Sequence, residues 1–471
     1  MEQEKRLKIG DKLEAMINGV DEKGRGLLRA GAKPGLAYFT IPGEKIGGEV
    51  VARNGGELRV RVETIMEPST DRVVPQCPDA GRCGGCPWQH ISYTRQCDLK
   101  LELINRAFAE SGLPETCNLK PETYIRAISQ YHYRNRMDYV FAVDGSLGLK
   151  TPEHWDMVLD LKDCRMLSKE AVEIMRIVRE LTKESAVPFW NNRVHAGFWR
   201  YLVIREGKNT GERLVLITTS GERFTDASHP ELAVSRACRG AEGLPLREKF
   251  EAALKPLATS LLWGINPEIT DLSIPKTIEP IFGETYLTEK INGFSYHIPC
   301  ASFFQTNSEM AAQLQNIVVE FAAPKPGEKI MDLYCGSGFL TLALAKAAER
   351  VIGVELDDAA VEIARGNAKL NNIANIDFRS GATEKLLAAA LAEMSPDTIV
   401  LDPPRAGLHP KALEALMGST AKRLVYVSCN PRALARDLKT LLTKYAIEKN
   451  RCLDLFPHTP HIETVISLGR Q

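Results

Sequence analysis

Hydrophobic and polar residues alternate in two different ways along the chain, and the change of pattern divides it. Over residues 1 to about 66, short stretches such as Leu58-Arg59-Val60-Arg61-Val62 alternate strictly and are separated by glycine-rich turns. Such alternation is typical of short strands, and five of them with glycine corners predict a small OB-like β-barrel. Arg53, Arg59 and Arg61 are candidates to face RNA, although charged strand faces are more often simply solvated.

From about residue 302 onward, apolar runs of strand length alternate with helical patterns. The runs cover residues 329–334, 350–355, 397–401 and 423–427. Strand–helix alternation predicts an α/β fold with a doubly wound, Rossmann-like parallel sheet. The block between barrel and sheet mixes strands and helices, which predicts a central α+β region.

The length of the chain indicates several domains, because 471 residues exceed one typical core. We predict a barrel over residues 1–68, a central domain over 69–95 and 120–290, and a C-terminal domain over 291–471. A helical pattern that ends at Gly112 assigns residues 96–119 to the C-terminal domain as well.

Composition describes an ordinary soluble protein, with 44% hydrophobic and 25% charged residues. The chain has no apolar stretch of bilayer length and no signal peptide at its N-terminus, so we expect a cytoplasmic monomer without membrane contact. Lysine plus arginine and aspartate plus glutamate number 60 each, and a net charge of zero neither favours nor excludes nucleic acid.

The 11 cysteines are too few for a disulfide scaffold in a chain of this length. Cys77, Cys83 and Cys86 form a C-x5-C-x2-C run with two glycines between the last pair. Three thiols this close can bind one metal centre, and zinc sites and iron–sulfur cubanes commonly take four thiolates. Cys164 is the best candidate for the fourth ligand. The spacing differs from the C-x3-C-x2-C of radical enzymes.

The strand at 329–334 leads into Cys335-Gly336-Ser337-Gly338, and the next strand ends at Glu355. Glycines at this corner let the backbone approach a ligand, and the acid is placed to accept hydrogen bonds from ribose hydroxyls. A dinucleotide site requires a third glycine, but Phe339-Leu340-Thr341 follows. The pattern Asp332-x-x-x-Gly336-x-Gly338 instead resembles the first motif of S-adenosylmethionine-dependent methyltransferases.

Three further polar positions lie at strand ends. Asp402-Pro403-Pro404-Arg405 follows one strand, and Cys429 followed by Asn430-Pro431 ends the next. Aminomethyltransferases carry an aromatic residue where Arg405 stands, so amine methylation is the poorer interpretation. A single cysteine is more often a small buried hydrophobe, but Cys429 shares this predicted sheet edge with Asp402. Glu463, between His461 and Thr464, begins the final strand.

These motifs together resemble the RNA uracil-5-methyltransferases over nearly the whole chain. The segments that carry the resemblance are the four cysteines Cys77, Cys83, Cys86 and Cys164, Phe304-Gln305-Thr306-Asn307, Asp332 to Gly338, Leu401 to Gly407, Ser428 to Pro431 and His461 to Val465. The N-terminal part looks like a TRAM module, and the combination of that module with the cysteines is similar to the RumA-like branch that methylates 23S rRNA.

The resemblance implies a role for each matching residue. Cys429 would be the nucleophile and Glu463 the base. From the chemistry rather than from the resemblance, Arg405 is a candidate either to help Cys429 ionise or to position the substrate through its oxygens. The cofactor S-adenosylmethionine would be bound by Gln305, Tyr334, Gly336, Gly338, Glu355 and Asp402. A [4Fe–4S] cluster would be held by Cys77, Cys83, Cys86 and Cys164. Two departures stand out: Phe339 follows the second motif glycine, and Gly381 or Ala382 stands where an acidic or polar residue is usual.

The chemistry explains why these residue types are needed. Carbon 5 of uracil is a weak nucleophile until a thiolate adds to carbon 6, and a base must then remove the carbon 5 proton so that the thiolate can leave. The uracil must also leave its stack. With the resemblance to the RumA-like branch, we expect methylation of carbon 5 of a uridine in 23S rRNA. The alternatives are tRNA uridine 54 and, from another class, a non-catalytic iron–sulfur RNA-binding protein.

Overall fold

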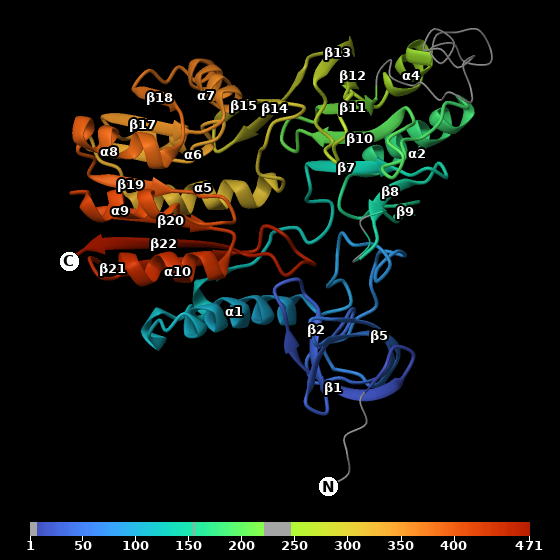
Figure 1. Cartoon of the computed structure of the whole chain (residues 1–471). Helices are drawn as coiled ribbons and strands as arrows, with labels where there is room; N and C mark the ends of the chain where they lie inside the picture. The colour runs from blue at the N-terminus through green and yellow to red at the C-terminus, as the bar shows by residue number, and fades with distance from the viewer. Residues whose placement is uncertain (1–6, 153, 155, 221–245) are drawn as a thin grey trace.

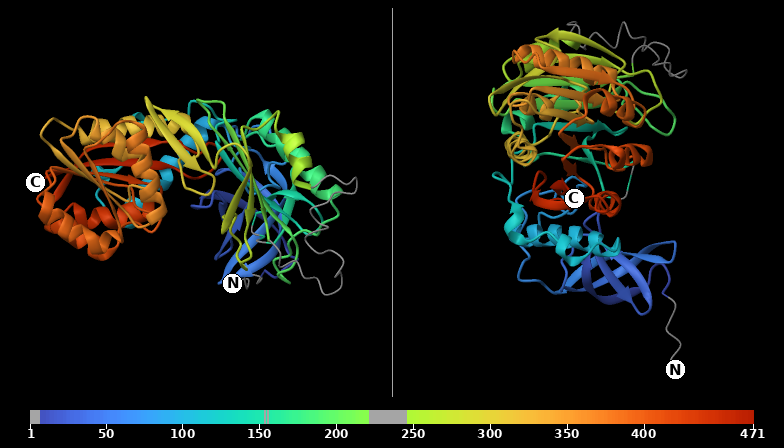
Figure 2. Two further views of the ribbon diagram at one scale, coloured as in Figure 1. Left: turned by 90° about the horizontal axis from the view of Figure 1, so that it is seen from above. Right: turned by 90° about the vertical axis from the view of Figure 1, so that its left-hand side faces the viewer.

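The computed structural model describes residues 7–152, 154, 156–220 and 246–471. Figure 1 shows three bodies, which are an N-terminal barrel, a central sheet and a larger C-terminal sheet flanked by helices. Two further views confirm that the central and C-terminal sheets lie beside each other, with the barrel below both (Figure 2). The chain therefore folds into three structural units that lie next to one another.

The N-terminal barrel is closed, with strand order β1-β2-β3-β5-β4. Its interior is filled by alternate apolar residues, among them Ile17, Leu28, Ile46, Val50 and Leu58, none more than 2% exposed. This confirms the barrel that the alternating pattern predicts. The strands are β1 (Lys12–Val20), β2 (Gly26–Ala30), β3 (Lys33–Ala37), β4 (Lys45–Asn54) and β5 (Glu57–Glu67).

The central sheet has the order β13-β12-β11-β10-β7-β8-β9 and is largely antiparallel, with helices packed on one face. Its core is rich in aromatic side chains, with Trp199 in contact with both Phe250 and Trp263. Its elements are β7 (Arg136–Phe141), β8 (Leu147–Lys150), β9 (Val158–Asp160), α2 (Lys169–Glu184), β10 (Trp199–Glu206), β11 (Arg213–Thr219), α4 (Leu246–Leu254), β12 (Ser260–Ile265) and β13 (Thr277–Phe282).

The C-terminal sheet has the order β18-β17-β16-β19-β20-β22-β21-β6. Strands β16 to β20 pair in parallel, as predicted, and β22 inserts antiparallel between β20 and β21. The strand order reverses between β16 and β19, which is where open α/β sheets bind ligands. The strands are β6 (Tyr124–Ile125), β16 (Lys329–Leu333), β17 (Arg350–Glu355), β18 (Ile376–Ser380), β19 (Thr398–Leu401), β20 (Arg423–Ser428), β21 (Tyr445–Leu453) and β22 (Glu463–Arg470).

Helices cover both faces of this sheet and form two separate cores. One face carries α5 (Ser308–Ala322), α6 (Phe339–Ala345) and α7 (Asp358–Leu370), together with the hairpin of β14 (Tyr286–Ile291) and β15 (Phe294–Pro299). The other carries α1 (Tyr93–Glu110), α8 (Thr383–Met394), α9 (Pro410–Gly418) and α10 (Pro431–Leu441). Two short 3₁₀ turns, η1 (Glu115–Cys117) and η2 (Pro121–Thr123), follow α1.

Helix α1 lies against α10 and reaches the barrel, as Figure 1 shows. It begins three residues before the predicted start because the Ser92 side chain accepts a hydrogen bond from the Arg95 amide and caps it. Within residues 120–290, β6 pairs with β21 at the edge of the C-terminal sheet. The other predicted domain boundaries stay predictions. Of the helices in the described ranges, none is both long and apolar enough to cross a bilayer.

Candidate active site

Cys429 directly follows the buried strand β20, at the edge of the sheet where the parallel strands end. The corner is held locally, because the Ser428 hydroxyl accepts from the Asn430 amide at 3.2 Å and donates to the Asn430 carbonyl at 3.1 Å. Asn430 then caps α10, whose first residue is Pro431. The half-buried thiol thus sits on a fixed corner rather than in a flexible loop.

Arg405 lies beside this corner. Its carbonyl accepts a hydrogen bond from the Asn430 side-chain amide at 2.7 Å, which joins the Asp-Pro-Pro-Arg loop to the cysteine corner. Its guanidinium Nη2 lies 3.4 Å and 3.5 Å from the two ring nitrogens of His461. Burial and the Arg405 charge lower the pKa of His461 to about 4, so this ring is neutral at physiological pH.

Glu463 and Asp402 place two carboxyl groups near the thiol. Burial and the charge of Asp402 raise the pKa of Glu463 well above its usual value, and burial raises that of Asp402 to about 7. Burial, with Glu463, also raises the pKa of Cys429 to about 11, whereas Arg405 lowers the pKa of both Glu463 and Cys429. The predicted nucleophile, base and arginine therefore lie close enough for their charges to affect one another.

Helix α1 supports the segment that carries His461 and Glu463, a role that sequence reasoning missed. The Lys100 ammonium donates to Asp454 at 2.6 Å and to the Phe456 carbonyl at 3.1 Å, and both ionic side chains are fully buried. The Gln96 side chain accepts from the His458 amide at 2.8 Å. His458 has a φ of +65°, an unusual conformation for a residue with a side chain. The conformation of this segment is therefore held by contacts with α1, which is distant in the sequence.

The glycine corner after β16 has the geometry of a nucleoside site. Glu355 at the end of β17 accepts hydrogen bonds from the amides of Gly336 at 3.0 Å, Leu356 at 2.7 Å and Asp357 at 3.0 Å, which fixes its carboxylate. Gly338 has a φ of +84°, and a Cβ there would lie 2.8 Å from a methyl carbon of Leu342. Glycine is therefore required at this turn.

Three other predicted cofactor residues lie around the same sheet edge. Tyr334 has a φ of +66° between β16 and the glycines, and Asp402 follows the neighbouring strand β19. The Gln305 carbonyl accepts from the Asn135 side chain at 2.9 Å, just before α5. Deep burial raises the pKa of Asp332 to about 7, and Thr341 donates to it at 2.5 Å.

The two departures from the family pattern have structural explanations. Phe339 faces the core, where its ring contacts Tyr296 and Phe304, and its carbonyl accepts from the Gln315 side chain at 2.7 Å. Gly381 has a φ of +146° and donates its amide to the Glu355 carbonyl at 2.8 Å. Phe339 thus packs in the hydrophobic core, and Gly381 holds the end of the strand that carries Glu355.

Of the four predicted cluster cysteines, three lie in the segment between the barrel and α1, and Cys164 lies between β9 and α2. The charge of Cys164 raises the pKa of Cys77, Cys83 and Cys86, although burial is the larger cause in each. Burial raises the pKa of Cys83 to about 11 and of Cys86 to about 12. The Gly85 amide donates to the Cys83 sulfur at 3.4 Å.

Within the described residues, no group of three or more His, Cys, Asp or Glu side chains is arranged to hold a single metal ion. Cys97 and Cys117, the other cysteines near this part of the sequence, are buried in or beside α1. The iron–sulfur cluster stays a prediction.

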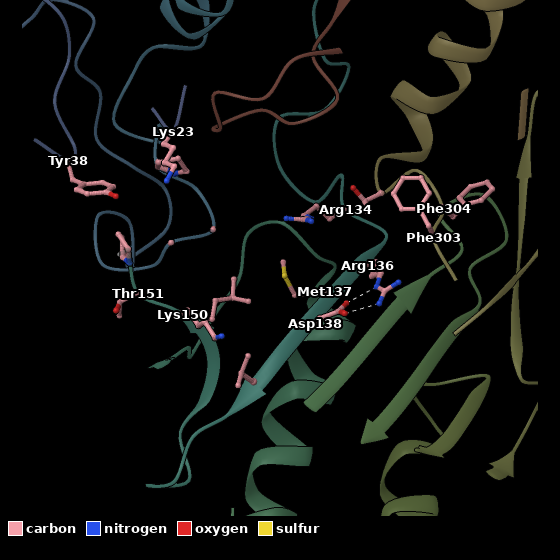
Figure 3. Close-up of a pocket in the computed structure, with 17 residues that line it drawn as sticks. Lys23, Tyr38, Arg134, Arg136, Met137, Asp138, Lys150, Thr151, Phe303 and Phe304 are labelled. Atoms are coloured by element: carbon pink, nitrogen blue, oxygen red, sulfur yellow. Dashed lines mark hydrogen bonds and ion pairs between the residues drawn. The ribbon is translucent and has the colours of Figure 1, made fainter. Parts of the chain in front are cut away.

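Two cavities open beside these residues. One, of about 680 Å³, is lined by Cys429, Arg405, His461 and the segments around them. The other, of about 730 Å³, lies between the barrel, the central sheet and the segment before α5, and Figure 3 shows its lining. Lys23, Gly84, Gly85, Pro87 and Arg134 line both. Each cavity has the size of a small-ligand site.

The reversed strand order, the glycine corner and the acid on β17 define the class of S-adenosylmethionine-dependent methyltransferases. The family described as tRNA (Uracil-5-)-methyltransferase matches residues 277–471. An uncharacterised RNA methyltransferase of Nanoarchaeum equitans is 35% identical to the chain, over 97% of the chain and 93% of that protein. The tRNA (uracil(54)-C(5))-methyltransferase of Pyrococcus horikoshii is 31% identical, over 97% and 100%.

A solved structure agrees with these relatives. The tRNA (uracil-54, C5)-methyltransferase of Pyrococcus abyssi, in complex with S-adenosyl-L-homocysteine, is 30% identical with a TM-score of 0.75, over 97% of this chain and 100% of that one. The chain belongs to the RNA uracil-5-methyltransferase family. It is an enzyme that uses S-adenosylmethionine to methylate carbon 5 of uridine in RNA. The family expected from the sequence is confirmed, and a non-catalytic protein is excluded.

Proposed function

We propose that Cys429 is the nucleophile and Glu463 the base of this methyl transfer. The observation that carries the proposal is that Cys429 and Arg405 line one cavity and that Glu463 lies close enough to raise the pKa of the Cys429 thiol. Cys429 adds to carbon 6 of the uracil, which makes carbon 5 nucleophilic. S-adenosylmethionine supplies the methyl group. Glu463 then takes the carbon 5 proton while the bond between sulfur and carbon 6 breaks.

Cofactor binding is assigned to Gln305, Tyr334, Gly336, Gly338, Glu355 and Asp402. Three backbone amides orient the Glu355 carboxylate, and its remaining lone pairs can accept from ribose hydroxyls. The glycine corner leaves space above Gly336, where no heavy atom lies within 4 Å of a Cβ position. The residues present therefore fit a nucleoside cofactor.

The charges around Cys429 determine how it becomes reactive. With a pKa of about 11, the thiol of the free enzyme is almost entirely protonated near neutral pH. Burial and the charge of Asp402 raise the pKa of Glu463 as well, which disfavours its ionised form. Arg405 favours the charged form of both groups, and a bound cation would act in the same direction. The enzyme is thus expected to be quiescent until its ligands are bound.

The decisive experiment uses RNA that contains 5-fluorouridine, whose carbon 5 fluorine cannot be removed as a proton. The wild-type enzyme should form a covalent adduct that survives denaturation, and Cys429→Ala should form neither adduct nor product. Cys452→Ala is a matched control, because that buried thiol lies in β21 and is assigned neither to the reaction nor to the cofactor. Methyl transfer by Cys429→Ala would refute the mechanism.

For the substrate, we propose tRNA uridine 54 as the first to test. Two relatives that match the full length of the chain are named for that position, one of them by a solved structure. The sequence-based prediction of 23S rRNA stays open and is tested in the same assay. Purified enzyme is incubated with a tRNA transcript and with a 23S rRNA transcript, and 5-methyluridine is mapped in each. Modification of 23S rRNA alone would overturn the tRNA assignment.

We also propose that Cys77, Cys83, Cys86 and Cys164 hold a [4Fe–4S] cluster. The supporting observations are that Cys164 lies close enough to raise the pKa of Cys77, Cys83 and Cys86, and that the Gly85 amide donates to the Cys83 sulfur at 3.4 Å. Anaerobic purification should give about four iron and four sulfide per chain. Cys83→Ser should lose most of the iron, whereas Cys117→Ser should retain it. Zinc in place of iron and sulfide would refute the cluster.

A further inference from the structure

The turn between β1 and β2 of the barrel forms part of the wall of the catalytic cavity. Glu22 and Lys23 of this turn line that cavity together with Cys429, and Lys23 also lines the second cavity. Figure 3 shows Lys23 and Tyr38 entering from the barrel side, opposite Arg136 and Phe303. The barrel therefore contributes directly to the site instead of acting as a separate module.

The turn is rigid and docked. Asp21 accepts at Oδ1 from the amides of Lys23 at 3.0 Å and Arg25 at 2.8 Å, which closes the turn on itself. The Gly24 carbonyl accepts from the indole nitrogen of Trp88 at 2.9 Å. Gly24 has a φ of +79°, and a Cβ there would lie 2.6 Å from that nitrogen and 3.3 Å from Pro460. The turn therefore packs tightly on both the Cys-rich segment and the catalytic segment.

Trp88 connects these three parts of the chain. Its ring binds the barrel turn, its amide donates to the His458 carbonyl at 3.0 Å, and its carbonyl accepts from the Gln96 side chain at 3.1 Å. Arg432, in the first turn of α10, forms ion pairs with Glu22 of the barrel turn and, at 3.3 Å, with Glu110 at the end of α1. The position of Lys23 relative to Cys429 is thus fixed by several independent contacts.

Two cations, Lys23 and Arg134, line both cavities and form no ion pair with a carboxylate within the described residues, although the Arg134 charge lowers the pKa of Cys86 and Cys164. Within the described residues, the Lys23 ammonium makes no hydrogen bond or ion pair, and the side chain is exposed. The Arg134 Nε is buried and has no hydrogen-bond partner in the same part of the structure. By contrast, Arg136, deeper in the second cavity, is neutralised by Asp138 through contacts of 2.7 and 2.8 Å. Cations without a carboxylate partner, at residues that line both cavities, favour an anion there.

We propose that Lys23, with Arg134, binds the phosphate that joins the target uridine to the neighbouring nucleotide, which enters the second cavity. The inference rests on the proposed function, since it takes the Cys429 cavity as the place where the uridine reacts. RNA carries a phosphate between every pair of nucleotides, so a chain that fills both cavities must pass one across the shared wall. The barrel turn would then set the distance between that phosphate and the nucleophile.

The test compares Lys23→Ala, Lys23→Arg and Lys12→Ala in the full-length enzyme. Lys12 is a matched control on the same barrel, because its ammonium is paired with Glu49 and Glu63 and it lines neither cavity. The probe is a synthetic RNA hairpin that carries the methylated uridine, and its Kd is measured between 50 and 200 mM salt. Loss of one phosphate contact lowers the slope of log Kd against log salt by about 0.7 to 0.9.

Lys23→Ala should show that lower slope and weaker binding, Lys23→Arg should restore the slope, and Lys12→Ala should resemble wild type. A neutral methylphosphonate on one side of the target uridine should weaken wild-type binding by the same factor and have no further effect on Lys23→Ala. A wild-type slope in Lys23→Ala, or additive effects for both phosphate positions, would overturn the proposal. The covalent adduct with 5-fluorouridine RNA is measured in parallel, so failure of the proposed chemistry is distinguished by its absence in wild type.

Discussion

Arg405 should control how readily Cys429 ionises, and Arg405→Met tests this directly. In the structure the pKa of Cys429 is about 11, with burial and Glu463 raising it and Arg405 lowering it. At pH 8 roughly one thiol in 1,000 is therefore a thiolate, which is the reactive form. An opposite charge within about 4–6 Å lowers a pKa by ~1–3 units. Because Arg405 is exposed and screened by solvent, we expect a shift near the lower limit.

Removal of the cation should therefore raise the thiol pKa by about one unit and slow alkylation of Cys429 at pH 8 roughly tenfold. The rate is followed by iodoacetamide labelling and peptide-resolved mass spectrometry, which separates Cys429 from the other cysteines. Below the thiol pKa the rate should rise tenfold per pH unit in both proteins, with the variant displaced to higher pH.

Two controls separate charge from structure. Arg405→Lys retains the cation and should keep most of the reactivity, although the contact of the planar guanidinium with His461 is lost. Arg365→Met removes an exposed arginine of α7 that pairs with Glu362 and should leave the Cys429 profile unchanged. An Arg405→Met enzyme with the wild-type pH profile would refute the electrostatic reasoning.

Three further predictions concern the base, the cofactor turn and the buried ion pair. Glu463→Gln should still form the covalent adduct but release product about 10²- to 10⁴-fold more slowly, as measured by single-turnover kinetics; normal turnover would exclude Glu463 as the base. Gly338→Ala should weaken S-adenosylmethionine binding about tenfold by calorimetry, since φ is +84° and a side chain costs ~1–2 kcal/mol there, whereas Gly366→Ala in α7, with no neighbour near its Cβ position, should not. Lys100→Met leaves Asp454 buried and unpaired, so the free energy of unfolding measured with denaturant should fall by ~3–5 kcal/mol. Adding Asp454→Leu should recover much of that loss. No recovery would mean that the two residues are not coupled.

The parts of the fold that depend on residues close together in the sequence could be predicted from local patterns. Each of these signals lies within a short stretch of sequence. They are the alternation in the barrel, the buried parallel strands and the glycine corner before α6, and the structure has all three where the patterns predict them. Cys429 and Glu463 could be singled out because each stands at the end of a recognisable strand. Their proposed roles are matters for experiment.

Contacts between distant segments left no such signal. The ion pair of Lys100 with Asp454 joins residues 354 positions apart, and Lys100 looks like an ordinary helix lysine in the sequence. Lys23 likewise stands in a turn of charged residues that would be solvated in an isolated barrel. Only the docking of Gly24 under Trp88 brings it to the cavity. Docking depends on the shapes of two folded units, and the hydrophobic periodicity of the sequence contains no information about those shapes.

The placement of α1 has a consequence for the order in which the molecule is assembled. This helix is synthesised well before its partners, because Lys100 and Asp454 are 354 positions apart and Gln96 and His458 are 362 positions apart. The barrel, whose contacts are local, can fold as it emerges, but the catalytic segment cannot be fixed until it contacts α1. Newly made protein would therefore carry a folded barrel before it carries a working active site.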